Sequence, residues 1–568
     1  MRGKLEWGWG VVALACSGSP VATAPPPSEL TFLHTSDVHS RLWPFRDRIS
    51  TVDADLGLGA EGELEEVGGA ARLATRLAEA RRDGAALWLD SGDLLEGAPV
   101  FGRYGGAVEV QLWGALGVDA MALGNHELSL SAEALQRLFA DARFPVLAAN
   151  LLPSASSSWL LPSVIVFAGR TAVGVVGCGN GGSPPSITAA NNPWGLSVVD
   201  AAAAVQSSID ELASRTELVV ALSHLGLEGD RDLIRATSGI DLVLGGHQHT
   251  LTLEPEWEKD CATRELQRAR GCSPRRVPIV HSGAYGRYLS RVELRLRAGE
   301  VTGVTLTHVP LSARVAPDPA TSAHLEAYQS PPESPLGYLP ERIARGTAHG
   351  GDSALGNLVT DAIQEWTGAD VVLLNSSGLR DDLEAGPLLA GDLELAFPFE
   401  EPWRLVWLSG RELRAGLHRT ARKSASRGCE TSVQVAGLWL RVHCDACREE
   451  LTACWRAGRG DTELADTERL LVALPRYLTL PGADFDALGE VGTDLALSVS
   501  QTLRRRLARA PRLLEPRDCA LDLERASPAR CAEAFGISCP ISAALAEHVC
   551  RGLPSIQGAR DGRVEMRP

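Results

Sequence analysis

The sequence has little of what a nucleic-acid-binding or membrane-spanning protein needs. Only 5% of its 568 residues are aromatic, Lys and Arg number 55 against 71 Asp and Glu, and the net charge is −16. Since no long basic run is present, a nucleic-acid polymer is excluded as the main partner. The apolar run "WGWGVVALAC" near the N-terminus is far shorter than the 18 residues of a membrane span. A small anionic substrate remains compatible with this charge if bound metal ions make the site positive.

The length excludes a single ordinary core and favours two domains with extensions. The chain is 45% hydrophobic and 22% charged, which is typical of a folded globular protein. A Pro-rich stretch over residues 313–339 separates the two expected domains.

The first 28 residues indicate export. Arg2 and Lys4 precede the short apolar run, and a Pro-rich linker follows it. Ala15 before Cys16 resembles a bacterial lipoprotein cleavage site, in which Cys16 would carry the lipid that anchors the protein to a membrane. A secreted or periplasmic protein without lipid is the alternative, and a cytoplasmic protein with an apolar N-terminus is the third. We therefore expect a periplasmic or cell-surface protein, lipid-anchored at Cys16.

Cysteine usage agrees with export. Apart from Cys16 and Cys178, the cysteines form even groups: Cys261 and Cys272; Cys429, Cys444, Cys447 and Cys454; Cys519, Cys531, Cys539 and Cys550. Such groups in an exported chain predict disulfides, whose pairing the sequence does not give. The second group also fits a structural zinc site. The last group lies in residues 511–568, expected to form a small helical appendage or a docking site for another surface protein.

Five apolar, strand-like runs each end in polar residues that no hydrophobic core would favour. They are residues 30–45, 85–97, 119–128, 218–226 and 241–249. Helical patterns lie between them, for example over residues 68–84. Strands alternating with helices predict an α/β fold, in which polar strand ends meet at the carboxyl edge of the sheet.

The residues at these strand ends have the chemistry of a metal site. They are Asp37, His39, Asp93, Asn125, His126, His224, His247 and His249. Carboxylate, imidazole and amide oxygen together suit Mn, Zn or Fe, whereas Ca or Mg alone would draw mainly oxygen ligands. One such histidine is more often a core or loop residue, but five at four of these strand ends indicate ligation. Without His126, seven ligands remain, which fit two ions that share one carboxylate.

The motifs "DVH", "GDLLEG", "GNHE", "SHLG" and "GHQH", in this order, resemble the calcineurin-like metallophosphoesterase superfamily. Residues 144–152 and 277–294 resemble its 5′-nucleotidase family, which includes bacterial UDP-sugar hydrolases and 2′,3′-cyclic-nucleotide phosphodiesterases. The resemblance implies a four-layer α/β/β/α catalytic domain followed by an α/β 5′-nucleotidase C-terminal domain. The expected segments are a leader and linker at 1–28, the catalytic domain at 29–312, a linker at 313–339, the substrate-binding domain at 340–510 and a Cys-rich tail at 511–568.

The resemblance also implies roles for the strand-end residues. One metal would be held by Asp37, His39, Asp93 and His249, and the other by Asp93, Asn125, His224 and His247. Asp93 would bridge two divalent ions (Mn, Zn, Co or Mg), which activate water for attack on phosphorus. His126 would stabilise the transition state or protonate the leaving oxygen. The family usually reads N-H-E-F-D, but Ser129 stands here in place of the Asp that orients this histidine. This predicts slower turnover, or another acid in that role.

Residues 340–510 resemble the family's C-terminal domain in "GNLVTDAI", "ADVVLLN", "GLR" and "FPF". The substrate-binding residues implied there are Asn375, Arg380, Trp403, Tyr477 and Asp484. The Arg380 guanidinium suits bidentate capture of an oxyanion. Trp403 and Tyr477 lie near two family aromatics that sandwich a nucleobase, although each alone is more typical of a core. His349 replaces a family Arg, and "PGADF", with Asp484, is a degraded form of the family's G-G-D-G-[FY].

Together these features predict an exported two-metal phosphoesterase that hydrolyses nucleotides, with nucleoside 5′-monophosphates as the leading substrates. Hydrolysis of cyclic nucleotides, 3′-nucleotides or UDP-sugars is the alternative, as is the sulfur-ester chemistry of related thiosulfohydrolases. A surface nucleotide-binding protein of the same fold with low turnover is a further alternative from a different functional class.

Overall fold

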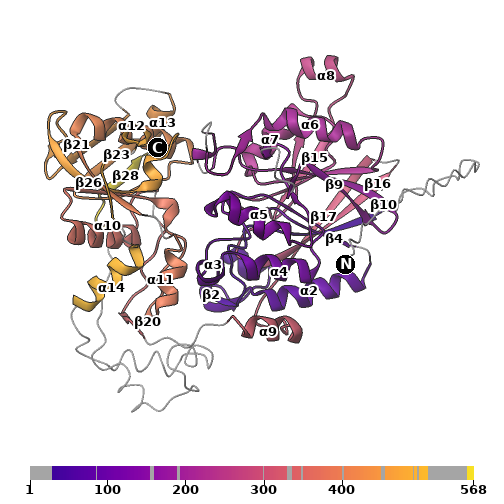
Figure 1. Cartoon of the computed structure of the whole chain (residues 1–568), viewed down its shortest axis with the longest axis horizontal. Coiled ribbons are helices and arrows are strands. Elements are labelled where there is room, and N and C mark those ends of the chain that lie inside the picture. The colour runs from indigo at the N-terminus through magenta and orange to yellow at the C-terminus, as the bar shows by residue number, and fades with distance from the viewer. Residues whose placement is uncertain are drawn as a thin grey trace, which may run out of the picture.

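The computed structural model describes residues 29–567 except 85, 154–158, 184, 189–191, 298–299, 329–334, 347–349, 400–401, 450–453, 490, 496–497 and 510–559. The expected leader with Cys16, the substituted position His349, and the last four cysteines lie outside the described residues. Figure 1 shows two bodies side by side, the first in indigo to pink and the second in orange to yellow.

The first domain is built on two β-sheets. The seven-stranded sheet has the order β17-β16-β1-β4-β5-β6-β8, with β1 (Glu29–Thr35), β4 (Ala86–Asp90), β5 (Ala120–Ala122), β6 (Val146–Leu147), β8 (Leu160–Leu161), β16 (Tyr288–Arg297) and β17 (Glu300–Pro310). The six-stranded sheet has the order β14-β15-β13-β12-β10-β9, with β9 (Ser163–Ala168), β10 (Thr171–Cys178), β12 (Leu218–Ser223), β13 (Leu242–Gly245), β14 (Glu256–Lys259) and β15 (Arg276–His281).

Side-chain alternation along each strand separates the layers. In β1, Phe32 packs between the two sheets whereas Leu33 faces the helices, and Leu87 and Trp88 of β4 divide in the same way. Helices α2 (Ala70–Arg82), α4 (Ala107–Leu116) and α5 (Ala132–Ala140) cover the first sheet; α6 (Ala201–Leu212) and α7 (Leu227–Ala236) cover the second (Figure 1). The predicted four-layer α/β/β/α domain is confirmed, and α2 is the helix expected within residues 68–84.

The strands that carry the polar motifs are parallel, so their carboxyl ends lie at one edge of each sheet. In the first sheet β1, β4 and β5 run parallel, and in the second β12 and β13 do. The polar residues after these five strands therefore converge between the two sheets. Smaller elements complete the domain: α1 (Thr51–Asp55), α3 (Pro99–Tyr104), α8 (Arg264–Arg270), β2 (Phe45–Arg48), β3 (Leu64–Val67), β7 (Leu151–Pro153) and β11 (Leu196–Val198).

The connecting segment carries α9 (Pro319–Glu326), which packs against α2. Beyond it, the second domain has a five-stranded sheet, β22-β19-β26-β21-β27, with β19 (Val371–Asn375), β21 (Trp403–Ser409), β22 (Val433–Ala436), β26 (Arg469–Pro475) and β27 (Thr493–Leu495). Its helices are α10 (Ala354–Thr367), α11 (Ala390–Ala396), α12 (Gly410–Ser426), α13 (Cys444–Arg448) and α14 (Val499–Arg509).

A smaller sheet in the second domain includes residues 564–567. Its order is β25-β24-β23-β28, with β23 (Trp439–His443), β24 (Trp455–Arg459), β25 (Thr462–Glu463) and β28 (Val564–Arg567). A further pair joins β18 (Gly337–Leu339) to β20 (Gly386–Leu388). Since β28 pairs in parallel with β23, the last described residues belong to the body of the second domain.

Three disulfides join described cysteines, namely Cys261–Cys272, Cys429–Cys444 and Cys447–Cys454. The zinc alternative for the middle group is wrong, because all four of its thiols are in disulfides.

Among the described residues, no helix combines the length and apolar composition that crossing a membrane requires.

Candidate metal centre

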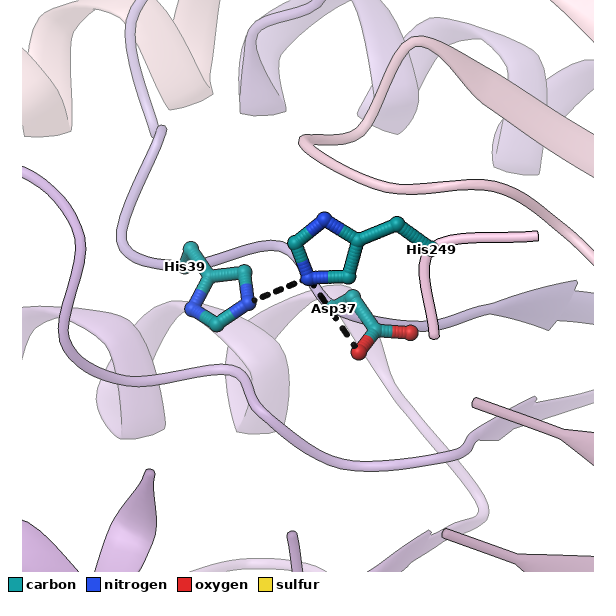
Figure 2. A group of neighbouring side chains, drawn as sticks. All are labelled: Asp37, His39 and His249. Carbon is teal, nitrogen blue, oxygen red and sulfur yellow. Dashed lines mark hydrogen bonds and ion pairs between the residues drawn. The ribbon is translucent and has the colours of Figure 1, made fainter. Parts of the chain in front are cut away.

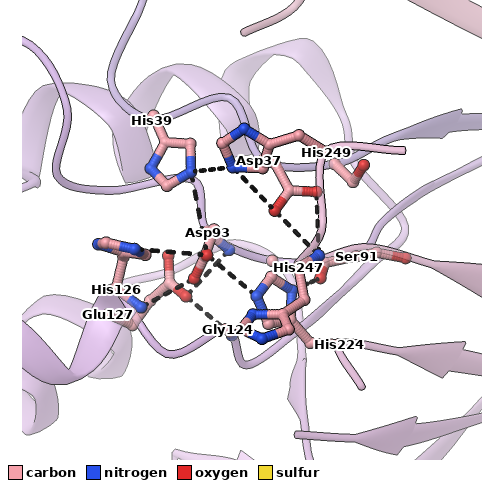
Figure 3. Close-up of polar contacts among 12 residues, drawn as sticks. Asp37, His39, Ser91, Asp93, Gly124, His126, Glu127, His224, His247 and His249 are labelled. Atoms are coloured by element: carbon pink, nitrogen blue, oxygen red, sulfur yellow. Dashed lines mark hydrogen bonds and ion pairs between the residues drawn. The ribbon is translucent and has the colours of Figure 1, made fainter. Parts of the chain in front are cut away.

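Seven side chains from the strand ends of the first domain form one group, which we call the Asp93 cluster: Asp37, His39, Asp93, His126, His224, His247 and His249 (Figure 3). They form three overlapping sets whose ligand atoms lie within 4.8 Å of one another: Asp37, His39 and His249 (Figure 2); His39, Asp93 and His126; and Asp93, His224 and His247. Asp93 is the carboxylate common to the last two sets, and His39 links the first two.

Backbone contacts fix the ring orientation of two of these histidines. His39 Nδ1 lies 2.8 Å from the Glu96 carbonyl oxygen, and His224 Nδ1 lies 2.6 Å from the Ser91 carbonyl oxygen. A carbonyl only accepts hydrogen bonds, so each Nδ1 carries a proton and each Nε2 is the ring nitrogen that faces the cluster. His224 Nε2 lies 3.0 Å from the Asp93 carboxylate, and His39 Nε2 lies 3.0 Å from His249 Nε2. This arrangement is typical of metal-ligating imidazoles.

The backbone is strained where the candidate ligands lie. Asp37, His39, Asp93, His247 and His249 all have φ between 52° and 83°, in the left-handed region that residues with a side chain rarely adopt. Such conformations cost roughly 1–3 kcal/mol each and collect at functional sites. The packed strands on either side therefore hold these five side chains in place against a local preference for other conformations.

The electrostatics of the cluster suit a cation. Burial raises the pKa of Asp37 to about 7; His224 opposes this rise and the Asp93 carboxylate adds to it. Burial, followed by Arg380, lowers the pKa of His39 and His249 well below the ordinary value, which keeps both imidazoles neutral. Buried carboxylates that repel each other, beside neutral imidazoles, are stabilised by a bound metal ion.

The remaining predicted ligand, Asn125, meets an independent test of fit. Its Oδ1 atom is buried and accepts no hydrogen bond from any described residue. Its neighbour His126 donates a backbone N–H to Asp93 Oδ1 at 2.8 Å, so Asn125 follows directly on the cluster. A buried amide oxygen without a donor is costly unless a ligand uses it. The donor set of carboxylate, imidazole and amide oxygen thus fits divalent metal ions.

Glu127 is a structural member of the site that the sequence reasoning missed. Its fully buried carboxylate accepts backbone N–H groups of Asp93 at 3.1 Å, Leu95 at 3.1 Å and Gly124 at 2.8 Å. It therefore ties the loop after β4 to the loop after β5. Gly124 is needed there because a Cβ would lie 2.2 Å from Asp93 Oδ1. The available signal was a charged residue, Glu127, at the polar end of the apolar run "DAMALGNHEL".

His126 lies at the edge of the cluster that faces the second domain. Its Nε2 is 3.9 Å from Asp93 Oδ2, and its Nδ1 is 2.6 Å from the Glu96 carboxylate. Burial alone would lower the pKa of His126, but Asp93 and the hydrogen bond with Glu96 together raise it. The Ser129 hydroxyl donates to the His126 carbonyl oxygen at 2.5 Å.

The second domain contributes two residues at the cluster. Arg380 Nη2 lies 3.0 Å from His39 Nε2 and 3.5 Å from His249 Nε2. Phe399 stacks on His126 with ring centroids 5.6 Å apart, and the Arg380 guanidinium lies over the Phe399 ring at 5.6 Å. Arg380 was predicted from the sequence, whereas Phe399, the last residue of the "FPF" motif, was not.

The acids beside Arg380 are paired with other arginines and not with Arg380 itself. The pairs are Asp381 with Arg41 at 2.8 Å, Asp382 with Arg342 at 2.8 Å, and Glu384 with Arg48 at 2.6 Å. Two of these pairs join the domains, and the Arg41 guanidinium also lies over the rings of Phe45 and Tyr285. The loop that carries Arg380 is thus fixed against the first domain.

The other predicted substrate-binding residues lie elsewhere, and two of them require correction. Trp403 is 2% exposed within the core of the second domain, so it offers no face to a base. The Asp484 carboxylate accepts from Thr420 Oγ1 at 3.0 Å and is almost fully buried. Both side chains therefore serve the packing of the second domain. Tyr477 is half-buried beside another core cluster. Asn375 ends β19 and donates Nδ2–H to Ser377 Oγ at 3.0 Å, a few residues from Arg380.

Comparisons with known proteins agree with the geometry. Residues 30–251 match the family model of calcineurin-like phosphoesterases, and residues 333–490 match that of the 5′-nucleotidase C-terminal domain. The 5′-nucleotidase of Bos taurus is 29% identical over 456 residues, covering 74% of this chain and 76% of the relative. The 5′-nucleotidase of Homo sapiens is 29% identical over 445 residues, covering 72% and 75%.

Solved structures share the fold of most of the chain. A 5′-nucleotidase precursor from Thermus thermophilus superposes with a TM-score of 0.74 and 23% identity, covering 94% of this chain and 99% of that one. The sulfate thiohydrolase SoxB of the same organism gives a TM-score of 0.69 and 21% identity, covering 85% and 94%.

Proposed function

Because the chain belongs to the 5′-nucleotidase family of calcineurin-like, metal-dependent phosphoesterases, we propose that it hydrolyses nucleotides at the Asp93 cluster. The observation that carries this proposal is the position of Arg380. Its guanidinium reaches across the domain boundary to within 3.0 Å of His39 Nε2, with the neighbouring acids already neutralised. An anionic substrate is thus attracted to the place where the candidate metal ligands meet.

We propose that two divalent ions bind in the cluster. Asp37, His39, Asp93 and His249 would hold one, and Asp93, Asn125, His224 and His247 would hold the other. Such ions polarise phosphoryl oxygens and lower the pKa of water, which is the chemistry they supply to phosphoesterases. Asp93 is proposed as the bridge because its carboxylate belongs both to the set with His39 and to the set with His224 and His247.

The protein's own residues would then orient the substrate. Arg380 binds the anionic part of the substrate through its planar fork of N–H donors. Phe399 covers one face of His126 and excludes water from it. His126 Nε2, which faces the cluster, is placed to give a proton to the leaving oxygen. The remainder of the nucleotide would extend toward the second domain, near Asn375.

We expect the protein, assayed with Mn, Zn, Co or Mg, to hydrolyse nucleoside 5′-monophosphates. Arg380→Gln should lower kcat/KM for these substrates by roughly 10- to 100-fold, since a lost charged hydrogen bond costs about 1.5–3 kcal/mol. Arg380→Lys should recover only part of this loss, because it restores the charge without the fork. Steady-state kinetics with nucleotides and with a small aryl phosphate measure both effects.

A matched control is Arg411→Gln on α12, whose side chain is 81% exposed and pairs with Asp466. Its kinetics should equal those of the wild type. Absence of nucleotide hydrolysis with every metal would refute the proposed function, whereas full activity in Arg380→Gln would refute only the role of Arg380.

We also propose that the protein is exported. The three disulfides among the described residues support this, since such bonds persist in oxidising compartments.

Lipidation of Cys16 stays a prediction. We expect Cys16→Ala to release the protein from the membrane fraction or to block its processing, as measured by fractionation and N-terminal mass. A wild-type protein found wholly soluble, with another mature N-terminus, would contradict lipidation.

A further inference from the structure

The ring of His126 has one strong polar partner among the described side chains, and this partner is Glu96. Glu96 Oε2 lies 2.6 Å from His126 Nδ1, and the side chains are 16% and 15% exposed. This distance is that of a charge-assisted hydrogen bond. Ser129, three residues after His126, uses its hydroxyl on the His126 carbonyl oxygen instead of the ring. Nothing at position 129 therefore fixes the direction of the imidazole.

Glu96 is itself held rigidly. It has φ 57°, in the left-handed region, and the next residue, Gly97, lies so close to His39 that a Cβ there would come within 2.6 Å of the His39 Cβ. The Glu96 carbonyl oxygen accepts from His39 Nδ1 at 2.8 Å. Glu96 thus contacts His39 through its backbone and His126 through its side chain. A strained conformation held by such packing is typical of a functional position.

The other contacts of His126 complete the geometry. Phe399 stacks on one face of the ring at an interplanar angle of 26°. The backbone N–H of His126 donates to Asp93 Oδ1 at 2.8 Å. With Nδ1 bonded to Glu96 and one face covered, Nε2 points to the Asp93 cluster, as Figure 3 shows for the labelled His126.

We propose that Glu96 is a positioning residue that orients His126 so that Nε2 protonates the leaving oxygen, a role that rests on the proposed hydrolysis. In that step a water oxygen bonds to phosphorus, and the bond from phosphorus to the leaving oxygen breaks with its electron pair moving to that oxygen. The Nε2 proton goes to the leaving oxygen, and a proton from the water later returns to His126 through solvent. Nδ1–H stays bonded to Glu96 throughout.

The test uses the full chain with Glu96→Gln, Glu96→Asp and His126→Asn. Glu96→Gln should lower kcat for a nucleoside 5′-monophosphate by about 10- to 100-fold, the range for removing partners that orient metal-bound histidines. KM and metal content should not change, because the side chain touches neither the substrate nor the candidate ligands. The kcat for nitrophenyl phosphate should fall less, since its leaving group needs no proton. Glu96→Asp should recover part of kcat, and the control Glu133→Gln on α5 should match the wild type.

A double-mutant cycle separates positioning from a general structural role. If Glu96 acts through His126, Glu96→Gln should cause no further loss in a His126→Asn background. In the metal-free protein, proton NMR should show a strongly downfield Nδ1 proton of His126. This signal should be absent from Glu96→Gln and from His126→Asn. Additive losses, or wild-type kcat in Glu96→Gln, would overturn the inference. A wild type that hydrolyses no phosphoester would refute the proposed function instead, while the NMR signal would still report on the contact between Glu96 and His126.

Discussion

In Asp93→Asn, phosphoester hydrolysis should fall by about a thousandfold or more. Asp93 is 1% exposed, and its carboxylate lies 3.0 Å from His224 and within 4.0 Å of His39 and His126. The asparagine amide has the same shape and can still accept the His126 backbone N–H. The substitution removes the one negative charge that the two sets of candidate ligands around Asp93 share. The loss should exceed the 10²–10³-fold typical of removing a single preorganised donor.

Metal content distinguishes this effect from misfolding. Elemental analysis should find fewer ions per chain in Asp93→Asn than in the wild type, and circular dichroism should be unchanged. The matched control is Asp119→Asn, a partly buried carboxylate that accepts the Trp88 backbone N–H at 2.8 Å, away from the cluster. This control should keep its activity. Wild-type turnover and wild-type metal content in Asp93→Asn would contradict the proposed bridge.

Trp403→Ala should destabilise the second domain by about 3–5 kcal/mol, the usual cost of truncating a buried aromatic side chain. Trp403 is 2% exposed and packs with residues of β19, α10 and α14. Its loss leaves a cavity in the core, so unfolding by denaturant should begin at a lower concentration. At temperatures where the variant is folded, the KM for nucleotides should stay close to the wild-type value.

Trp407 on the same strand provides the control. It is 57% exposed, and Trp407→Ala should change stability by less than about 0.5 kcal/mol. If Trp403 stacked on a base instead, Trp403→Ala would raise the KM for nucleotides and leave stability unchanged. That result would show that Trp403 binds the substrate and does not pack in the core.

The comparison of Trp403 with Phe399 shows where sequence reasoning fails. Both aromatics follow α11 within a few residues, and local sequence does not state which one faces the first domain. Phe399 meets His126, whereas Trp403 begins β21 and points into the core. The difference depends on how two domains pack, which involves residues far apart in the chain.

The family resemblance implied the four layers of the first domain. The sequence by itself determined its α/β character and the polar residues at the strand ends. This was possible because the period of the apolar residues defines the strands, and parallel strands bring their carboxyl ends to one edge whatever the loops do. Asp37, His39, Asp93, His224, His247 and His249 all met as expected. Only the tertiary structure decided the disulfide pairing, the contact of Glu96 with His126, and the approach of Arg380 to His39, 341 residues away in sequence. These contacts join loops and domains, and no local periodicity encodes which side chains of two such segments will face each other.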